Sequence, residues 1–419
     1  MANKNRMYYG EYSLSHWVDL ILQKNIELPS YQRSFVWGSN DVHRLISSLN
    51  KGYFVPPVTI AHYGVGEEKR NWIVDGQQRL TSILLFAIGY VPNRAKFDQK
   101  EETIAVGDDS NDENVEEYKN APIQWTFREL VNLNKTLSEL RESLRGDDRY
   151  TPIADKDTRI KDVDDFLKRN YIGFSYIVVD DAQDQNQFSA TLFRNINYWG
   201  IHLSSVESRR SLYYMNTSLL KFFDGKTLGN EDVLCNIHIQ ENLQPCKIDF
   251  VRYLSILSQY CVVKNADKVL VGYSAYSTRE NFYADYVSYV VGIEQNSRPD
   301  KFDGFSFESV FPNNEWQSRF AKLRHLIKTL SEKMDLETKN NCKMFTSWID
   351  ADYWLFGLLY VVLFEEKNIE IQNTGLAENI TAAIKKKKQD VVYAKSPNRL
   401  GYLRKRIIES ISIYHNYVS

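Results

Sequence analysis

Five consecutive residues, Asp75-Gly76-Gln77-Gln78-Arg79, carry the side chains best suited to binding a phosphate. Arg79 offers a planar pair of N–H donors that matches a phosphate group. Gln77 and Gln78 can orient a phosphate oxygen or a water, and Asp75 can hold a metal ion or a ribose hydroxyl. Gly76 lets a ligand approach the backbone closely. Together these residue types indicate an anion-binding turn.

The flanking residues place this turn at the start of a helix. Residues 71–74 favour a strand, Asp-Gly is a turn signal, and Leu80, Ile83, Leu84 and Ala87 recur at helical spacing. The first N–H groups of a helix have no partner inside it, and the helix dipole adds partial positive charge, so this position favours an anion. The alternative is an ordinary strand-to-helix turn with solvated polar residues.

A second Gln-Arg pair, Gln32-Arg33, lies between the aromatic residues Tyr31 and Trp37. A second arginine near the turn would neutralise further phosphate charge. Arg33 could equally pair with a carboxylate or stack between its aromatic neighbours.

A third polar segment spans residues 193–210. Ser204 can cap a helix, and Glu207 follows it at the capping-box spacing, which explains both residues structurally. Asn197 and Arg209 are not explained in this way. They are candidates for a binding role or for solvated positions.

Three stretches, in this order, resemble the signature regions of the domain of unknown function 262 family (DUF262). They are residues 28–37 (Leu-Pro-Ser-Tyr-Gln-Arg-Ser-Phe-Val-Trp), the Asp-Gly-Gln-Gln-Arg-Leu-Thr string at 75–81, and residues 193–209. The resemblance covers about residues 10–215. This family supplies the N-terminal module of GmrSD-type restriction systems, and its core is similar to the ParB/sulfiredoxin fold.

The resemblance implies a nucleotide-binding and NTP-hydrolysing module of an anti-phage or restriction-type system, acting as a sensor or regulator. The implied cofactors are a nucleoside triphosphate, GTP or ATP, and Mg²⁺, with Asp75 as the metal residue. The implied catalytic residues are Asp75, Gln77, Gln78 and Arg79. The implied nucleotide-binding residues are Gln32, Arg33, Gly76, Arg79, Asn197, Glu207 and Arg209.

The chain departs from many relatives in its lack of an HNH-type nuclease motif. Its seven histidines stand singly and never at metal-ligand spacing. DNA cutting by this chain itself is therefore doubtful. We expect DNA as a partner, allow for a separate nuclease or effector protein, and allow for a homo-oligomer.

The composition indicates a globular chain with more than one core, since 43% of its 419 residues are hydrophobic. The net charge of -2 gives no global attraction to nucleic acid or membrane, so any such binding needs a local patch. The four cysteines lack C-x-x-C spacing, and we expect buried free thiols in a reducing compartment. No signal peptide or spanning run is predicted, which indicates a cytoplasmic protein.

The predicted fold class is α+β. A small mixed ParB/sulfiredoxin-like sheet with helices is expected through residue 215, with an acidic insert near 100–120. A mainly α-helical domain is expected over 216–419, with a linker at 296–314. The predicted helices of this half cover residues 249–261, 280–291, 315–333, 345–364 and 377–388, with a last helix from residue 397.

The densest basic run, Lys385 to Lys388, lies in this second half. Such a run is commonly a solvated helix face. Other cations follow it closely and could extend it into a strip that tracks phosphates. They are Lys395, Arg399, Arg404, Lys405 and Arg406.

Three functional hypotheses follow. The first is an NTP-binding sensor or regulator whose two Gln-Arg segments enclose the nucleotide. The second is a metal-dependent nuclease that uses Asp75, Gln78 and Glu207 around Mg²⁺. The third is a non-catalytic DNA-binding protein in which the Asp75–Arg79 turn grips the DNA backbone.

Overall fold

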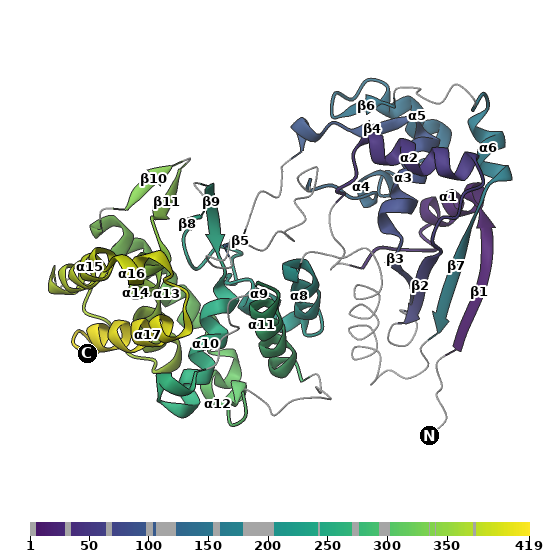
Figure 1. Cartoon of the computed structure of the whole chain (residues 1–419). Helices are drawn as coiled ribbons and strands as arrows, with labels where there is room; N and C mark the ends of the chain where they lie inside the picture. Colours follow the sequence, from purple (N-terminus) through teal and green to yellow (C-terminus); the bar gives the residue numbers. More distant parts are fainter. Residues whose placement is uncertain are drawn as a thin grey trace. The chain divides into compact units, whose positions relative to one another are not determined.

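The structure is a computed structural model of the chain (Figure 1). It divides into two compact units, each of which is described by itself. Unit 1 comprises Met1–Glu101 and Glu116–Leu203, and unit 2 comprises Glu102–Val115 and Ser204–Ser419. The structure describes residues 6–29, 35–63, 69–97, 104–105, 123–153, 160–178, 205–241, 244–269, 276–292, 302–334, 336–339, 341–371 and 374–419.

Unit 1 contains a four-stranded mixed sheet with the strand order β1-β7-β2-β3. Its strands are β1 (Arg6–Ser13), β2 (Val58–Tyr63), β3 (Arg70–Asp75) and β7 (Tyr171–Val178). β7 runs antiparallel to β1 and parallel to β2, and β2 is antiparallel to β3 with a bulge between Thr59 and Ile60. The alternation typical of strands turns Val58 and Ile60 into the core, where both are buried.

The helices of unit 1 gather around α3. They are α1 (Leu14–Leu22), α2 (Ser39–Asn50), α3 (Gln77–Ile88), α4 (Arg128–Val131), α5 (Leu137–Leu144) and α6 (Val163–Arg169). α1, α2, α5 and α6 all contact α3, as does β4 (Tyr90–Pro92), which pairs antiparallel with β6 (Tyr150–Pro152). As a result α3 is buried at every position except Phe86, whereas the sequence pattern alone predicts only one apolar face.

Unit 2 is mainly helical. Together with the mixed sheet and helices of unit 1, this confirms the predicted α+β class for the chain. Its helices are α8 (Ser205–Tyr213), α9 (Leu220–Phe223), α10 (Phe250–Val263), α11 (Tyr276–Val290), α12 (Phe307–Val310), α13 (Trp316–Lys333), α14 (Trp348–Leu359), α15 (Thr374–Gln389), α16 (Val391–Lys395) and α17 (Leu400–His415). α14 continues into a π-helical turn, Tyr360–Phe364. The predicted linker at 296–314 includes α12 within its described part. The predicted domain boundary at residue 215 stays a prediction.

Unit 2 also contains a five-stranded sheet that the sequence patterns do not predict. Its order is β10-β11-β8-β9-β5. The strands are β5 (Ile104–Ala105), β8 (Ile237–Glu241), β9 (Gln244–Ile248), β10 (Glu337–Lys339) and β11 (Cys342–Phe345). Each has at most five residues, and β10 is exposed throughout, so alternation has little length in which to show. Within the described part of the chain, no helix is long and apolar enough to cross a bilayer.

A buried charge network joins three helices of unit 2. The carboxylate of Asp352 on α14 accepts two hydrogen bonds from the Arg252 guanidinium on α10, at 2.7 and 3.0 Å. It also accepts one from Arg406 on α17 at 2.9 Å and one from the Tyr253 hydroxyl at 2.9 Å. Burial by itself raises the pKa of Asp352, but the two guanidiniums outweigh burial and lower it. Asp352 is therefore charged in the folded protein.

Asp352→Asn is expected to destabilise the folded state at pH 7 by about 3 kcal/mol or more, because two buried guanidiniums lose their carboxylate. Since folding lowers the pKa of Asp352, its stabilising contribution is complete above the unfolded value near 3.9 and is lost as the pH falls through the folded value. In urea unfolding, the difference in unfolding free energy between wild type and variant should therefore be constant from pH 7 to about pH 5 and should narrow as the pH is lowered below about 4. The exposed Asp303→Asn change is the control and should show no such difference.

Candidate functional site

The turn between β3 and α3 requires a glycine at residue 76. Gly76 has φ +95°, in the left-handed region that side chains disfavour. A Cβ at this position would lie 2.9 Å from Cγ2 of Val58 on the neighbouring strand. Gly76 is also the N-cap of α3 and has no side chain to cap the first amides of the helix. The predicted strand, turn and helix are all present at the predicted place.

The guanidinium of Arg79 is bonded within this turn. Nη2 donates to the Asp75 carboxylate at 2.6 Å, and Nη1 donates to the carbonyl oxygens of Pro56 and Pro57. The side chain is 11% exposed, against 43% for that of Asp75. Arg79 thus ties the loop before β2 to the end of β3 and orients the Asp75 carboxylate. The phosphate contact predicted for Arg79 stays a prediction.

Gln78 connects the turn to the segment that follows the second Gln-Arg pair. Its Oε1 accepts hydrogen bonds from the backbone amides of Val36 at 3.1 Å and Trp37 at 3.4 Å. Gln32 and Arg33 lie outside the described residues. Val36 and Trp37, which follow them in the chain, contact the Asp75–Arg79 turn, and the closure of the site by Gln32 and Arg33 stays a prediction. Gln77 is also buried, at 5% exposure.

Asp75 is the part of the turn that is open to a cation. Only its Oδ2 takes part in the bond with Arg79, and the side chain is half-exposed. Among the described residues, no group of three or more His, Cys, Asp or Glu side chains could hold a metal ion. One carboxylate fits Mg²⁺ only when phosphate oxygens and waters complete the octahedron. The residues present therefore fit a magnesium–phosphate complex and not an all-protein metal site.

The third predicted segment lies in a different environment. Asn197 is outside the described residues, as is the side chain of Glu207. Arg209 belongs to α8 in unit 2, where its side chain is 1% exposed and its Nη2 bonds Asp249 Oδ2 at 2.7 Å. Its guanidinium also lies 5.4 Å from the centre of the Tyr283 ring on α11. Its described contacts are those of a buried structural ion pair, and its predicted role in nucleotide binding stays a prediction.

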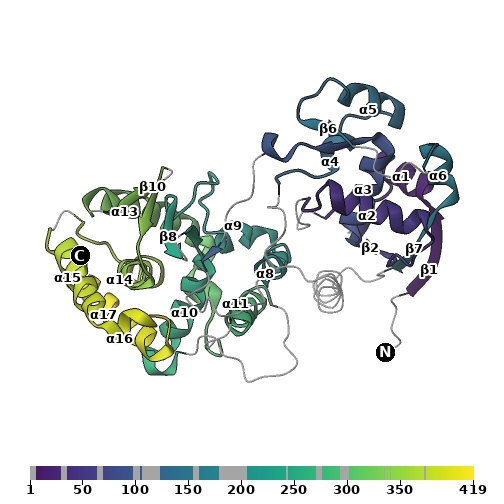
Figure 2. The ribbon, with the colours of Figure 1, turned by 45° about the horizontal axis from the view of Figure 1, so that its top comes forward.

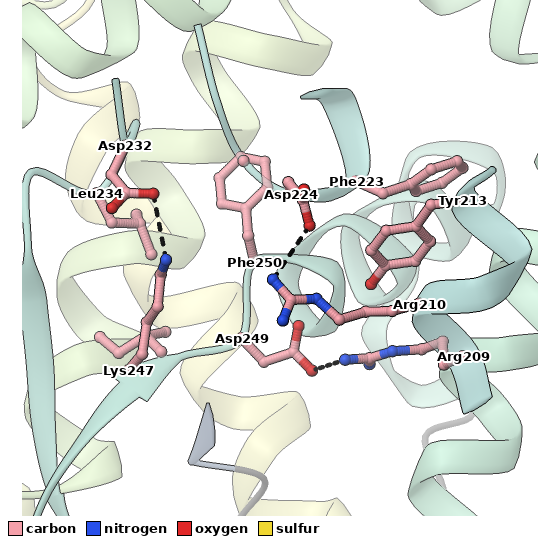
Figure 3. Close-up of a pocket in the computed structure, with 12 residues that line it drawn as sticks. Arg209, Arg210, Tyr213, Phe223, Asp224, Asp232, Leu234, Lys247, Asp249 and Phe250 are labelled. Atoms are coloured by element: carbon pink, nitrogen blue, oxygen red, sulfur yellow. Dashed lines mark hydrogen bonds and ion pairs between the residues drawn. The ribbon is translucent and has the colours of Figure 1, made fainter. Parts of the chain in front are cut away.

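A small cavity adjoins Arg209 (Figure 3). Its volume is about 40 Å³, enough for one or two waters and far below the several hundred that a nucleotide needs. Three cations at the cavity each have a carboxylate partner. The pairs are Arg209–Asp249 at 2.7 Å, Arg210–Asp224 at 3.4 Å and Lys247–Asp232 at 3.3 Å. The cavity is thus electrostatically balanced and is not a separate nucleotide pocket.

Asp249 is a residue whose double role the sequence does not reveal. Its Oδ1 caps α10 by accepting from the Val251 amide at 3.0 Å, while Oδ2 binds Arg209. The sequence signal for the cap is present, an Asp directly before an apolar helical run. Arg209 and Asp249 are forty residues apart, and no local pattern links them.

The fold of unit 1 and the Asp75–Arg79 turn together define a class of protein domain. Unit 1 is a mixed α+β domain whose central helix begins at a glycine-capped, partly acidic turn. Residues 14–214 match the family described as GmrSD restriction endonuclease, N-terminal domain. Over these residues the chain belongs to that family, which is the DUF262 family, and this makes it a component of a restriction-type, DNA-targeting defence system. No curated protein and no solved structure matches, so the likeness to the ParB/sulfiredoxin fold stays a prediction.

Gly76→Ala is expected to cost more stability than Gly89→Ala at the other end of α3. Both glycines have positive φ, +95° and +86°, so both changes incur the backbone penalty of about 1 kcal/mol. Only Gly76 also faces a close neighbour, because no atom lies within 4 Å of a Cβ at Gly89. In thermal unfolding, the midpoint should be lowest for Gly76→Ala, higher for Gly89→Ala and highest for the wild type. Equal midpoints for the two variants would contradict the tight approach to Val58.

Arg79→Met is expected to destabilise unit 1 by about 2 kcal/mol, since it leaves an aspartate and two carbonyls without their donor. The matched control is Arg70→Met on β3. Arg70 pairs with Glu27 at 2.6 Å, but its side chain is 53% exposed. Such a surface pair contributes about 1 kcal/mol or less. Chemical denaturation of both variants measures the difference, and an Arg79 variant as stable as the Arg70 variant would show that the turn does not depend on Arg79.

Proposed function

We propose that unit 1 binds a nucleoside triphosphate, GTP or ATP, with Mg²⁺ at the Asp75–Arg79 turn, and that its hydrolysis regulates a restriction-type response to DNA. The nucleotide and its hydrolysis come from the family resemblance. The observation that carries the proposal is local: the N-terminus of the twelve-residue helix α3 starts at a glycine, directly after the half-exposed Asp75. A helix N-terminus attracts phosphate, and a neighbouring carboxylate can complete the coordination of phosphate-bound Mg²⁺.

The side chains of the turn take different parts in this proposal. Asp75 would hold the metal. Gly76 supplies the left-handed backbone with which α3 begins, and its contact with the nucleotide is what the family resemblance implies. Arg79 is a positioning residue that holds the Asp75 carboxylate, and Gln78 holds the chain that follows Arg33. Direct phosphate contacts by Gln77, Gln78 and Arg79, and closure of the site by Gln32 and Arg33, are what the family resemblance implies. A phosphate bound by backbone amides does not depend on the Gln78 and Arg79 contacts, because both side chains already have partners within unit 1.

The described contacts favour this hypothesis over the two alternatives. In a nuclease built on Asp75, Gln78 and Glu207, Gln78 would be a metal ligand, yet its Oε1 already accepts two backbone amides. In a turn that grips the DNA backbone, Arg79 would be the natural contact, yet its guanidinium is engaged by Asp75 and two carbonyls. A phosphate seated on backbone amides requires neither side chain to be released.

Thermal unfolding of the full chain with GTP, ATP, CTP and UTP tests the proposal. At least one triphosphate should raise the midpoint in the presence of Mg²⁺, and EDTA should reduce the shift. A ligand at a hundred times its Kd stabilises by about 2.7 kcal/mol, which is readily measured. Asp75→Asn should lose most of the Mg²⁺-dependent shift, because the amide is a poor metal ligand although it can still accept a hydrogen bond from Arg79.

The control for this experiment is Asp19→Asn, an equivalent change at an exposed position of α1. It should respond to nucleotide as the wild type does. Release of phosphate, assayed with and without DNA, tests hydrolysis separately. A protein that none of the four triphosphates stabilises would exclude the proposed nucleotide site.

A further inference from the structure

The C-terminal helices of unit 2 concentrate positive charge. Residues 381–405, from α15 to the first part of α17, contain eight Lys and Arg and one Asp. Their formal charge of +7 contrasts with -2 for the whole chain, which leaves -9 for the other residues. The charge of the chain is therefore strongly segregated, although its total is near zero.

Some of these cations hold the helices together. Lys387 of α15 pairs with Glu409 of α17 at 3.0 Å and lies 5.0 Å from the centre of the Tyr393 ring of α16. Lys388 pairs with Asp350 at 2.6 Å, and Arg404 donates two hydrogen bonds to the Val269 carbonyl. Arg406, which the sequence also offers as a strip residue, is buried against Asp352. The predicted strip is therefore shorter than the run of cations in the sequence.

Five cations remain available at the surface. They are Lys385, Lys386, Lys395, Arg399 and Lys405, and we call them the C-terminal cationic surface. All five are exposed, and in the described part of the chain none has a carboxylate within ion-pair distance. Figure 1 and Figure 2 both place α15, α16 and α17 together at one end of unit 2, and α15 contacts both of the others. The five cations thus belong to three neighbouring helices and the turn between α16 and α17.

We propose that the C-terminal cationic surface binds the phosphate backbone of double-stranded DNA. Unpaired exposed lysines gain affinity from a polyanion by releasing its condensed counterions. The proposal rests on the proposed function only in taking DNA as the target of the system. It places the DNA contact outside residues 14–214, the part of the chain that matches the restriction family.

The composition of the surface favours DNA over an anionic membrane. The exposed apolar side chains beside it are Val391 at 74%, Val392 at 63% and Ile408 at 47%. α16 has five residues, and Tyr393 at its centre is buried, so it offers no continuous apolar face for insertion. Lysines are also depleted from the cores of protein–protein interfaces. Backbone phosphates are the partner that these five cations fit best.

The test is DNA binding by the full chain, measured by the fluorescence anisotropy of a short labelled duplex between about 50 and 200 mM salt. The variant carries Lys386→Gln, Lys395→Gln and Lys405→Gln. Its affinity should fall at least about tenfold, and the slope of log K against log salt should become shallower by about 2 to 3, because three phosphate contacts are lost.

The matched control carries Lys51→Gln, Lys328→Gln and Lys339→Gln, three exposed lysines elsewhere in the chain. It has the same net charge as the first variant and should bind as the wild type does. Equal loss in both variants would overturn the proposal in favour of general electrostatic attraction. It would also be overturned by a wild type that does not bind the duplex, or that binds only vesicles of phosphatidylcholine and phosphatidylserine.

The nucleotide-induced thermal shift of the cationic-surface variant separates this inference from the proposed function. A retained shift with weakened DNA binding supports the assigned surface. If this variant binds DNA as the wild type does and keeps its nucleotide-induced thermal shift, the proposed DNA surface is wrong and the proposed nucleotide site still stands. If no nucleotide shift occurs even in the wild type, the proposed function fails, and the comparison of the two lysine variants still decides the DNA surface.

Discussion

The guanidinium of Arg79 is the contact on which the geometry of the candidate site depends. It joins the first turn of α3, the end of β3 and the loop before β2 through Asp75, Pro56 and Pro57. A guanidinium can do this because its donors are spread over separate nitrogens in one rigid plane, whereas the three donors of an ammonium all lie on a single nitrogen. Gln78 adds the segment from Val36. The turn is thus pre-arranged by buried side chains, and Asp75 is the most exposed side chain of the five.

The sequence predicts the strand, turn and helix at residues 71–88 because each has a local signal: β-favouring residues, an Asp-Gly pair and apolar residues at helical spacing. It also predicts that the chain near Arg33 lies beside this turn, and the bonds from Gln78 to Val36 and Trp37 are consistent with that. The partners of Arg79 could not be predicted. Two of them are backbone carbonyls more than twenty residues away, and a carbonyl carries no sequence signal. The burial of α3 on nearly all sides likewise results from tertiary packing, and no property of its own sequence fixes it.

In unit 2 as well, the sequence predicts elements that have a local signal and misses those that depend on tertiary contacts. Its long helices are predicted to within a few residues, because each contains apolar residues at helical spacing, and α10 and α14 also begin at a capping side chain. Its sheet is not predicted, since two of its five strands have three residues or fewer. The family match ends at residue 214, whereas the main part of unit 2 begins at Ser204. α8 therefore belongs to the family by sequence and to unit 2 by packing. The Arg209–Asp249 pair explains how this occurs: a family arginine completes its ion pair with a carboxylate beyond the family's limit.

Arginine and lysine side chains have different environments in the described part of this chain. The buried cations of the described residues are all arginines: Arg79, Arg209, Arg252, Arg319 and Arg406. The C-terminal cationic surface consists of four lysines and one arginine. This division follows from their chemistry, because a guanidinium is weakly hydrated and satisfies several acceptors at once, whereas an ammonium retains its water. An arginine in a sequence motif is therefore as good a candidate for a buried structural contact as for a phosphate contact. The described contacts of Arg79 and Arg209 are structural. In our two proposals, phosphate is therefore attracted by helix amides in unit 1 and by exposed lysines in unit 2.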